Sequence, residues 1–324
     1  MPRAIHPDMP FEHGRGRSAE RPQDIPARGW LDIARRLKER ISASRLSIIA
    51  AGVAFYALMA IPPGLIALVS LYGLVFDPQQ VVDQIRALSG ILPAEATDVL
   101  ASQLGEVASS DRTALGVGSA VAILVALWSS SSGMRTLMQA LNVAYEEEET
   151  RGTLRFYATA LVLTLLAIIG ALLAIALVVA VPAAMTILGL GAFAKVAATV
   201  ATLLVLAGGM LAGLAVVFRY GPSRSKPQWR WATPGAIFAT LMWIAGSALF
   251  SLYVANFASY NETYGSMGAI VILLTWLLLT AYVILIGGEL NAEMERQTAR
   301  DTTDANQRLG RRGASAADTV GASR

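Results

Sequence analysis

The stretch FYATALVLTLLAIIGALLAIALVVAVPAAM, residues 156–185, contains no charged residue. A helix needs about 20 apolar residues to cross a bilayer core about 30 Å thick, so this stretch is long enough to span a membrane. Across the chain 15% of the residues are charged and the mean hydropathy is +0.53, whereas soluble domains contain about 25% charged residues. The sequence therefore predicts an all-α protein embedded in a lipid bilayer rather than a water-soluble globule.

Five further apolar stretches approach or exceed the same length, and we expect each of them to form a membrane-spanning helix. They are residues 46–76, 114–141, 196–218, 235–253 and 267–286. The stretch at 114–141 is the least regular of the six. Together these stretches predict a polytopic membrane helix bundle with six transmembrane helices over residues 46–290.

The positive charges are divided unevenly between the segments that connect these spans. With Arg135, near the inner end of the second span, counted in the third segment, the segments from the N-terminus onward contain 10, 2, 3, 1, 4, 0 and 6 lysines and arginines, so the odd-numbered segments hold 23 and the even-numbered ones 3. Cytoplasmic loops carry the excess of positive charge in membrane proteins, which predicts that both termini are cytoplasmic. Because the basic residues are spread over four segments, they do not form the single basic surface that nucleic-acid binding requires.

The segments outside the spans differ in composition. Residues 1–29 contain charges and prolines but no apolar signal-peptide core, and we expect a disordered cytoplasmic tail there. Residues 30–45 predict an amphipathic helix in the inner headgroup layer, or a solvated helix that leads into the first span. Residues 77–113 contain six acidic and two basic residues, with apolar positions every three or four residues, and predict a small external helical cap. We expect residues 291–324 to form a cytoplasmic tail that is largely disordered.

The first span contains Pro62 and Pro63 close to its middle. Proline has no backbone N–H and its ring clashes with the preceding helical turn, so we expect a kinked first helix. Discontinuous helices mark substrate sites in many transporters, although kinks that serve packing alone are commoner.

A polar stripe runs along one face of the inner part of the second span. Trp128, Ser132, Arg135, Gln139 and Asn142 are separated by four, three, four and three residues, which places them on one helix face. At inner-leaflet depth such a stripe is expected to face the bundle or water. The alternative is an arginine that snorkels to the interface beside serines that pack against a neighbouring helix.

The sixth span repeats this pattern more weakly. Thr275, Tyr282 and Glu289 are spaced seven residues apart, in line with Gly268. Glu289 is expected just past the inner end of the span, at a depth similar to that of Arg135, where it either pairs with Arg135 or lies beside the headgroups.

The sequence offers little for catalysis. It has no cysteine, and its two histidines, His6 and His13, both lie near the N-terminus, so most zinc and cysteine chemistry has no ligands. No phosphate-binding loop, metalloprotease motif or nucleophile elbow is present. We therefore expect a protein that is not an enzyme and that uses no metal and no cofactor.

Several motifs in combination resemble the YihY/BrkB family of bacterial inner-membrane proteins, over roughly residues 46–293. They are Ala54-Phe55-Tyr56 with Pro62, Trp128 through Ser132-Gly133 to Leu141-Asn142-Val143-Ala144-Tyr145, Arg219 with Pro222, Pro234-Gly235-Ala236, Tyr253, Tyr264-Gly265-Ser266, and Gly287-Gly288-Glu289-Leu290-Asn291-Ala292-Glu293. One departure is Met59, which stands where members often carry a serine before the span-one proline.

The resemblance implies a six-helix protein of the inner membrane with cytoplasmic termini, and export of lipids has been suggested for relatives. Our leading interpretation is a transporter or flippase-like translocator of a lipid or another amphiphile. The alternative is a non-transporting scaffold for envelope proteins, and a membrane enzyme ranks behind both. Membrane lipids are the expected partners, followed by a second copy of the chain or envelope proteins. The candidate residues of the substrate path are Tyr56, Pro62, Pro63, Trp128, Ser132, Arg135, Gln139, Asn142, Thr275, Tyr282 and Glu289.

Overall fold

The fold was analysed in a computed structural model of the chain. It describes residues 15–16, 19, 21–43, 45–75, 115–145, 147–189, 191–224, 229–256 and 266–297. The external cap expected at 77–113 and the C-terminal residues 298–324 lie outside the described residues. So do the first 14 residues of the expected N-terminal tail.

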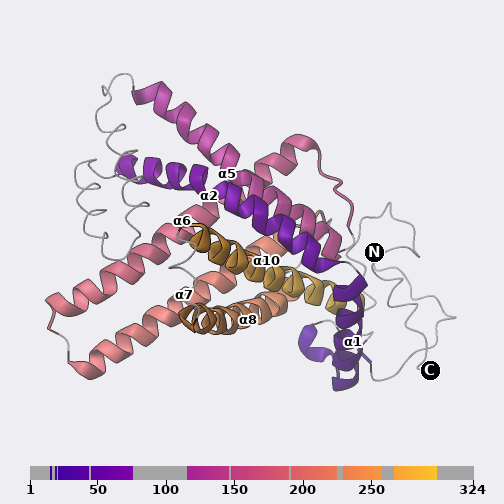
Figure 1. Ribbon diagram of the computed structural model, residues 1–324. Coiled ribbons are helices and arrows are strands. Elements are labelled where there is room, and N and C mark those ends of the chain that lie inside the picture. Colours follow the sequence, from indigo (N-terminus) through magenta and orange to yellow (C-terminus); the bar gives the residue numbers. More distant parts are fainter. Residues whose placement is uncertain are drawn as a thin grey trace.

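Within these ranges every regular element is a helix, as the sequence predicts. The elements are η1 (Pro22–Asp24), α1 (Ala27–Ala43), α2 (Leu46–Val75), α5 (Leu115–Tyr145), α6 (Thr153–Ile187), α7 (Ala192–Tyr220), α8 (Trp229–Asn256) and α10 (Ser266–Gln297). Figure 1 shows the long helices meeting at the end of the molecule that α1 crosses. At the opposite end, α6 and α7 extend away from α2 and α5.

Five helices are long and apolar enough to cross a membrane, and each coincides with a predicted span. The apolar stretches are Leu46–Pro63, Thr153–Met185, Ala192–Tyr220, Trp229–Val254 and Ile270–Gln297. The remaining predicted span, 114–141, is covered by α5, a single helix of 31 residues that is not among these five. The structure therefore supports a multi-pass helical membrane protein, while the sixth span stays a prediction.

The first predicted span forms one helix. α2 continues through both Pro62 and Pro63 to Val75. The structure therefore shows no complete break at the prolines, and the kink expected there stays a prediction.

The boundaries of both terminal segments differ from those expected. η1 precedes α1, Ile25 is buried, and Arg15 forms an ion pair with Asp32 at 3.0 Å, so part of the segment expected as a disordered tail is folded against α1. At the other end α10 continues to Gln297, and Glu293 is fully buried. Residues 291–297 are therefore an ordered part of the bundle and not the start of a tail, because they pack against α1.

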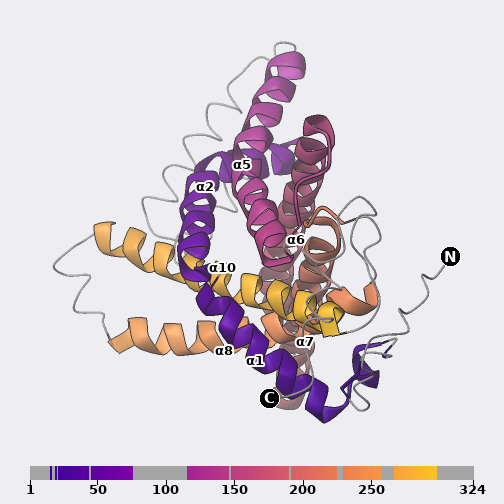
Figure 2. The same cartoon turned by 90° about the vertical axis from the view of Figure 1, so that its right-hand side faces the viewer.

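One face of the amphipathic helix α1 packs against the bundle, while its expected place in the inner headgroup layer stays a prediction. Ile33 of α1 is buried in a cluster with Trp231 of α8 and Met294 of α10. Figures 1 and 2 both show α1 lying across the end of the bundle. One face of α1 thus closes this end of the bundle, while Trp30 and Leu31 remain exposed.

The main core lies where α8 crosses α10. Pro234 is in the interior of α8, and a proline inside a helix leaves neighbouring backbone groups in need of other partners. Asn291 of α10 supplies them: its Oδ1 accepts from the Gly235 N–H at 2.7 Å, and its Nδ2 donates to the Ala232 carbonyl at 3.2 Å. A Cβ added at Gly235 would lie 2.2 Å from the carbonyl oxygen of Gly287, so the two backbones touch.

This backbone contact predicts a glycine requirement at residue 235. We expect Gly235→Ala to lower the free energy of unfolding by about 1–3 kcal/mol, as overpacking typically does, because the new methyl group would meet the backbone of α10. Thermal unfolding in detergent measures the loss. Gly209→Ala in α7 is the matched control, because a Cβ there meets nothing within 4 Å. An equal loss of stability in both variants would contradict the proposed contact.

Candidate functional site

Arg135 lies between a hydroxyl group and two aromatic rings. Its Nη1 donates to the Ser131 Oγ at 2.5 Å and to the Trp128 carbonyl at 3.3 Å. Its Cζ lies 5.3 Å from the Trp128 ring centroid and 5.1 Å from that of Tyr157 in α6. We call these four residues, Trp128, Ser131, Arg135 and Tyr157, the Arg135 site.

Helix geometry assembles this site. Ser131 and Arg135 are one turn apart and Trp128 and Arg135 two turns apart, so all three share a face of α5. The Trp128 and Tyr157 rings stack with centroids 4.9 Å apart, which joins this face to α6. Among the described residues, the groups that contact the Arg135 guanidinium are thus uncharged.

The site is open on one side. Arg135 is half-buried and Trp128 is 48% exposed. A guanidinium presents five N–H donors in a planar fork that suits phosphate and carboxylate oxygens. The arrangement can therefore bind an anionic group from the open side, with the two rings beneath an apolar chain.

The polar stripe does not act as one unit. Ser132 is half-buried and its carbonyl accepts a hydrogen bond from Thr136, while Gln139 is exposed. The hydroxyl that contacts Arg135 belongs to Ser131 and not to Ser132. Sequence reasoning missed Ser131 and Tyr157. The spacing of four residues could have identified Ser131, whereas nothing in the sequence placed Tyr157.

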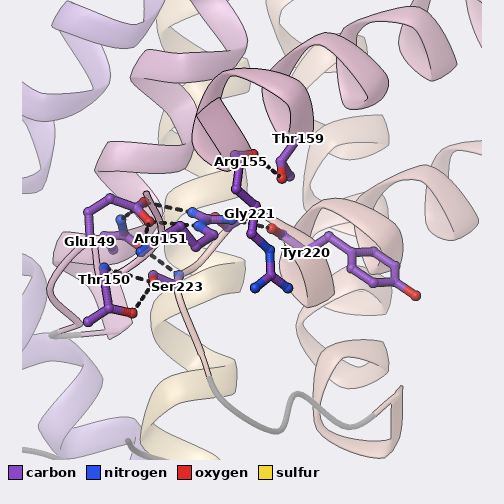
Figure 3. Close-up of polar contacts among 9 residues, drawn as sticks. Glu149, Thr150, Arg151, Arg155, Thr159, Tyr220, Gly221 and Ser223 are labelled. Carbon is purple, nitrogen blue, oxygen red and sulfur yellow. Dashed lines mark hydrogen bonds and ion pairs between the residues drawn. The ribbon is translucent and has the colours of Figure 1, made fainter. Parts of the chain in front are cut away.

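Asn142, the last member of the stripe, is buried in a separate network. Figure 3 labels its partners in this network, Glu149 and Ser223. The Asn142 Oδ1 accepts from the Ser223 N–H at 2.7 Å, and its Nδ2 donates to Glu149 at 2.9 Å. Glu149 in turn forms an ion pair with Arg151 at 2.7 Å. Arg151 donates to the carbonyl groups of Tyr220 and Gly221, which are backbone acceptors at the end of α7. Asn142 therefore joins the end of α5 to the α5–α6 and α7–α8 connections and has a structural role.

The first span approaches α5 near the Arg135 site, and the atoms that come close there belong to the backbone of Tyr56 and Ala57. A Cβ added at Gly133 would lie 3.3 Å from the Ala57 Cα and 3.5 Å from the Tyr56 carbonyl oxygen, so α2 and α5 are in close contact there. The Tyr56 side chain and Pro62 are exposed, and Pro63 is half-buried.

The candidates from the sixth span are dispersed along α10. Thr275 is exposed and its hydroxyl donates to the Val271 carbonyl at 2.7 Å. Tyr282 is half-buried, and Glu289 is 2% exposed. The burial of Glu289 places it inside the bundle, so the expectation that it lies beside headgroups was wrong.

A buried cluster of charges at the end of α10 was not predicted. Glu293 has no exposed surface and accepts from Arg36 of α1 at 2.6 Å and from Arg296. Nearby, Arg224 binds Glu295 at 2.5 Å and lies over the Tyr145 ring at 4.5 Å. The sequence gives no signal for the Arg36 pair, because its partners are 257 residues apart. Among the described residues, no three His, Cys, Asp or Glu side chains form a group that could hold a metal ion.

Comparison of the sequence with known proteins identifies a matching family. A family model described as virulence factor BrkB matches residues 37–310. The chain is 30% identical to the putative ribonuclease-like protein YfkH of Bacillus subtilis over 263 residues, which are 76% of this chain and 89% of that protein. It is also 31% identical over 94 residues to a UPF0761 membrane protein of Pseudoalteromonas translucida, and 36% identical over 85 residues to one of Vibrio vulnificus. These two matches cover 31% and 27% of the relatives, and 29% and 26% of this chain. No solved structure matches the chain.

The Asn142 network predicts a dependence of stability on pH. Burial raises the pKa of Glu149, but the hydrogen bonds from Arg151 and Asn142 outweigh it and hold this pKa below its ordinary value of 4.5. Because the pKa is lowered in the folded state, Glu149 contributes stability above pH 4.5 that is lost as the pH falls through the folded pKa. Thermal unfolding between about pH 3 and pH 6 should therefore show a smaller acid loss for Glu149→Gln than for the native chain. Equal profiles for Glu149→Gln and the native chain would contradict the prediction.

Proposed function

This chain belongs to the virulence factor BrkB family of membrane proteins, and we propose that it translocates a lipid or another anionic amphiphile across the bilayer. The observation that carries the proposal is the Arg135 site, a cation within an apolar helix bundle whose guanidinium, in the part of the chain that the structure describes, contacts uncharged groups. The proposal involves no catalytic step, no metal and no cofactor.

The position of Arg135 gives this observation its weight. Arg135 contacts Tyr157, four residues beyond the start of the apolar stretch of α6 at Thr153, which is about 6 Å at 1.5 Å per residue. On insertion scales a charged side chain costs about 2.5–3.5 kcal/mol at the more demanding bilayer centre, which is an upper bound for this shallower position. Cation–π contacts recover about 0.5–2 kcal/mol, so an anionic ligand would supply the compensation that the chain itself does not.

The surroundings of the site suit an amphiphile. Trp128 and Tyr157 offer two stacked rings beside the cation, so a phosphate could bind Arg135 while an acyl chain follows the apolar surface. The prolines of α2, Pro62 and Pro63, would give the kink through which the headgroup passes. Of the other path candidates, Tyr56, Ser132, Gln139, Thr275 and Tyr282 are exposed or half-buried, and Asn142 and Glu289 are buried.

The proposal includes a location and a topology. We place the chain in the bacterial inner membrane with six spans, both termini in the cytoplasm and the segment 77–113 outside. This arrangement would put the end of the bundle that α1 crosses on the cytoplasmic side.

Reporter fusions test the topology. A reporter fused after Arg324 should give a cytoplasmic signal, and one inserted within residues 77–113 should give an external signal, because the lysines and arginines favour the odd-numbered segments. Opposite signals at either position would contradict the six-span arrangement.

A non-transporting scaffold is the second candidate, and one observation favours it. The ion pairs of Glu293 and Glu295 connect α1, α10 and the α7–α8 connection, which would make this end of the bundle a firm platform. A second copy of the chain or an envelope protein would then be the partner. Failure of the transfer experiment below would favour this candidate.

The transfer experiment uses Arg135. In reconstituted vesicles the native chain should accelerate the transfer of a labelled anionic lipid, and Arg135→Ala should abolish that acceleration because the phosphate loses its cation. Arg135→Lys should retain part of it, because an ammonium group binds phosphate without the bidentate fork. Trp128→Leu should reduce transfer less than Arg135→Ala does.

The control separates this role from a loss of charge or fold. Arg35→Ala removes an exposed arginine of α1 that pairs with Glu39 and should leave transfer unchanged. Thermal unfolding verifies that each variant is folded. Native protein that transfers lipid no faster than protein-free vesicles, with gradients supplied, would overturn the proposal.

A further inference from the structure

A second arginine rests on aromatic rings at the end of the bundle, away from the Arg135 site. The Arg219 Cζ lies 4.6 Å from the Trp229 ring centroid and 5.3 Å from that of Tyr220. The two rings meet edge to face at 6.1 Å, and each residue is 46% exposed. Arg219 therefore forms the centre of an exposed aromatic surface where α7 ends and α8 begins.

Within the described part of the chain Arg219 has no anionic partner. Its Nε is buried and has no hydrogen-bond partner there, and its guanidinium contacts the two rings. A buried donor left without a partner costs about 1–3 kcal/mol. Such a group is therefore expected to receive an acceptor from outside the chain.

Arg155 of α6 adds a second positive charge to this surface. Arg151, one turn before it, donates to the Tyr220 carbonyl at 3.0 Å, so the start of α6, which carries Arg155, lies next to the end of α7. Figure 3 draws Arg155 and Tyr220 in the same close-up. Arg155 is exposed, and among the described residues its hydrogen bond to Thr159 is made by its carbonyl group and not by its side chain. Its guanidinium is therefore available to a ligand.

The surrounding sequence contributes no negative charge. Residues 150–261 contain no aspartate or glutamate, and their basic residues are Arg151, Arg155, Lys195, Arg219, Arg224, Lys226 and Arg230. Among the described residues Arg151, Arg155, Arg219, Arg224 and Arg230 lie at or near the ends of α6, α7 and α8 that meet here. Of these, Arg151 is paired with Glu149 and Arg224 with Glu295. The surface therefore carries an excess of positive charge.

The position of the surface identifies the ligand. The apolar stretches of α6, α7 and α8 end here at Thr153, Tyr220 and Trp229, so these residues mark the boundary between hydrocarbon and headgroups. Tryptophan and tyrosine prefer this boundary, and basic pockets between transmembrane helices bind the headgroups of anionic lipids. A soluble anion would gain nothing from the apolar helix faces below.

We infer that Arg155, Arg219, Tyr220 and Trp229 form a binding site for one anionic phospholipid, which stays bound and is not the transported molecule. Its phosphate lies between the two guanidinium groups, and its acyl chains lie along the apolar faces of α6 and α7. The inference does not rest on the proposed translocation, since it involves other residues and another helix pair.

Lipid retention tests the site. Purified protein is delipidated and titrated with phosphatidylglycerol or phosphatidylcholine, and bound lipid is counted by native mass spectrometry. The native chain should retain one phosphatidylglycerol in preference to phosphatidylcholine. Arg155→Ala and Arg219→Ala should each weaken phosphatidylglycerol binding about fivefold, which corresponds to one basic residue near an anionic lipid surface.

Matched variants make the result specific. Lys195→Ala removes an exposed cation at the opposite end of α7 and should leave binding unchanged, whereas Arg219→Lys should retain most of it. Because Arg155 is exposed, Arg155→Ala keeps the test valid even if Arg219→Ala impairs folding. The series is repeated with Arg135→Ala, which removes any lipid held at the Arg135 site.

Three outcomes would overturn the inference. The first is equal retention of the anionic and the neutral lipid by the native chain. The second is unchanged binding in Arg155→Ala and Arg219→Ala, or an equal loss in Lys195→Ala. The third is displacement of phosphatidylglycerol by inorganic phosphate alone, which would show that the occupant is a soluble anion.

Discussion

The contact between α8 and α10 at Gly235 and Gly287 is the constraint on which the rest of the structure depends. A proline inside a helix leaves backbone groups to be satisfied, and in a bilayer they must find partners within the protein. Asn291 provides these partners by bonding the Gly235 N–H and the Ala232 carbonyl. The absence of side chains at the two glycines lets the backbones approach closely enough for these bonds to form. The crossing thereby fixes the orientation of α10, whose last turns carry the buried charges.

Those charges fix the end of the bundle. Replacing one member of a buried ion pair leaves the other charge uncompensated, so such pairs hold their elements in one arrangement even where their net contribution to stability is small. Glu293 is bound by arginines of α1 and α10, and Glu295 by Arg224 after α7. In contrast, the far halves of α6 and α7 expose apolar side chains such as Leu173 and Leu204, as expected for surfaces that face lipid. The molecule thus combines a fixed end with helices that spread apart at the other (Figure 1).

Hydropathy predicted the helical class and the spans because burial in lipid acts on every residue of a span at once. The prediction failed where individual contacts between residues distant in sequence determine whether a segment is buried. The end of α10 has the composition of a soluble tail, and only its packing against Arg36 and Trp231, distant in sequence, buries it. In the same way the spacing of the polar stripe located Arg135 and Trp128, but not Tyr157, which another helix contributes. The same spacing grouped Asn142 with Arg135, although the fold assigns Asn142 to the network that holds Glu149 and Ser223.

Arg219 and Arg135, the two arginines that lie on aromatic rings, differ in position, and this difference distinguishes a site of lipid attachment from a site of lipid transport. Arg219 lies at the end of the apolar stretch of α7, where a headgroup can bind it without leaving the interface. Arg135 lies on α5 and contacts Tyr157, about one turn beyond the start of the apolar stretch of α6 at Thr153, so a headgroup that binds it enters the bundle just inside the interface. Among the described residues the groups that contact its guanidinium are uncharged, and an anionic ligand would offset the cost of inserting this cation. The uncharged surroundings of Arg135 are therefore what favours the entry of an anionic headgroup into the bundle.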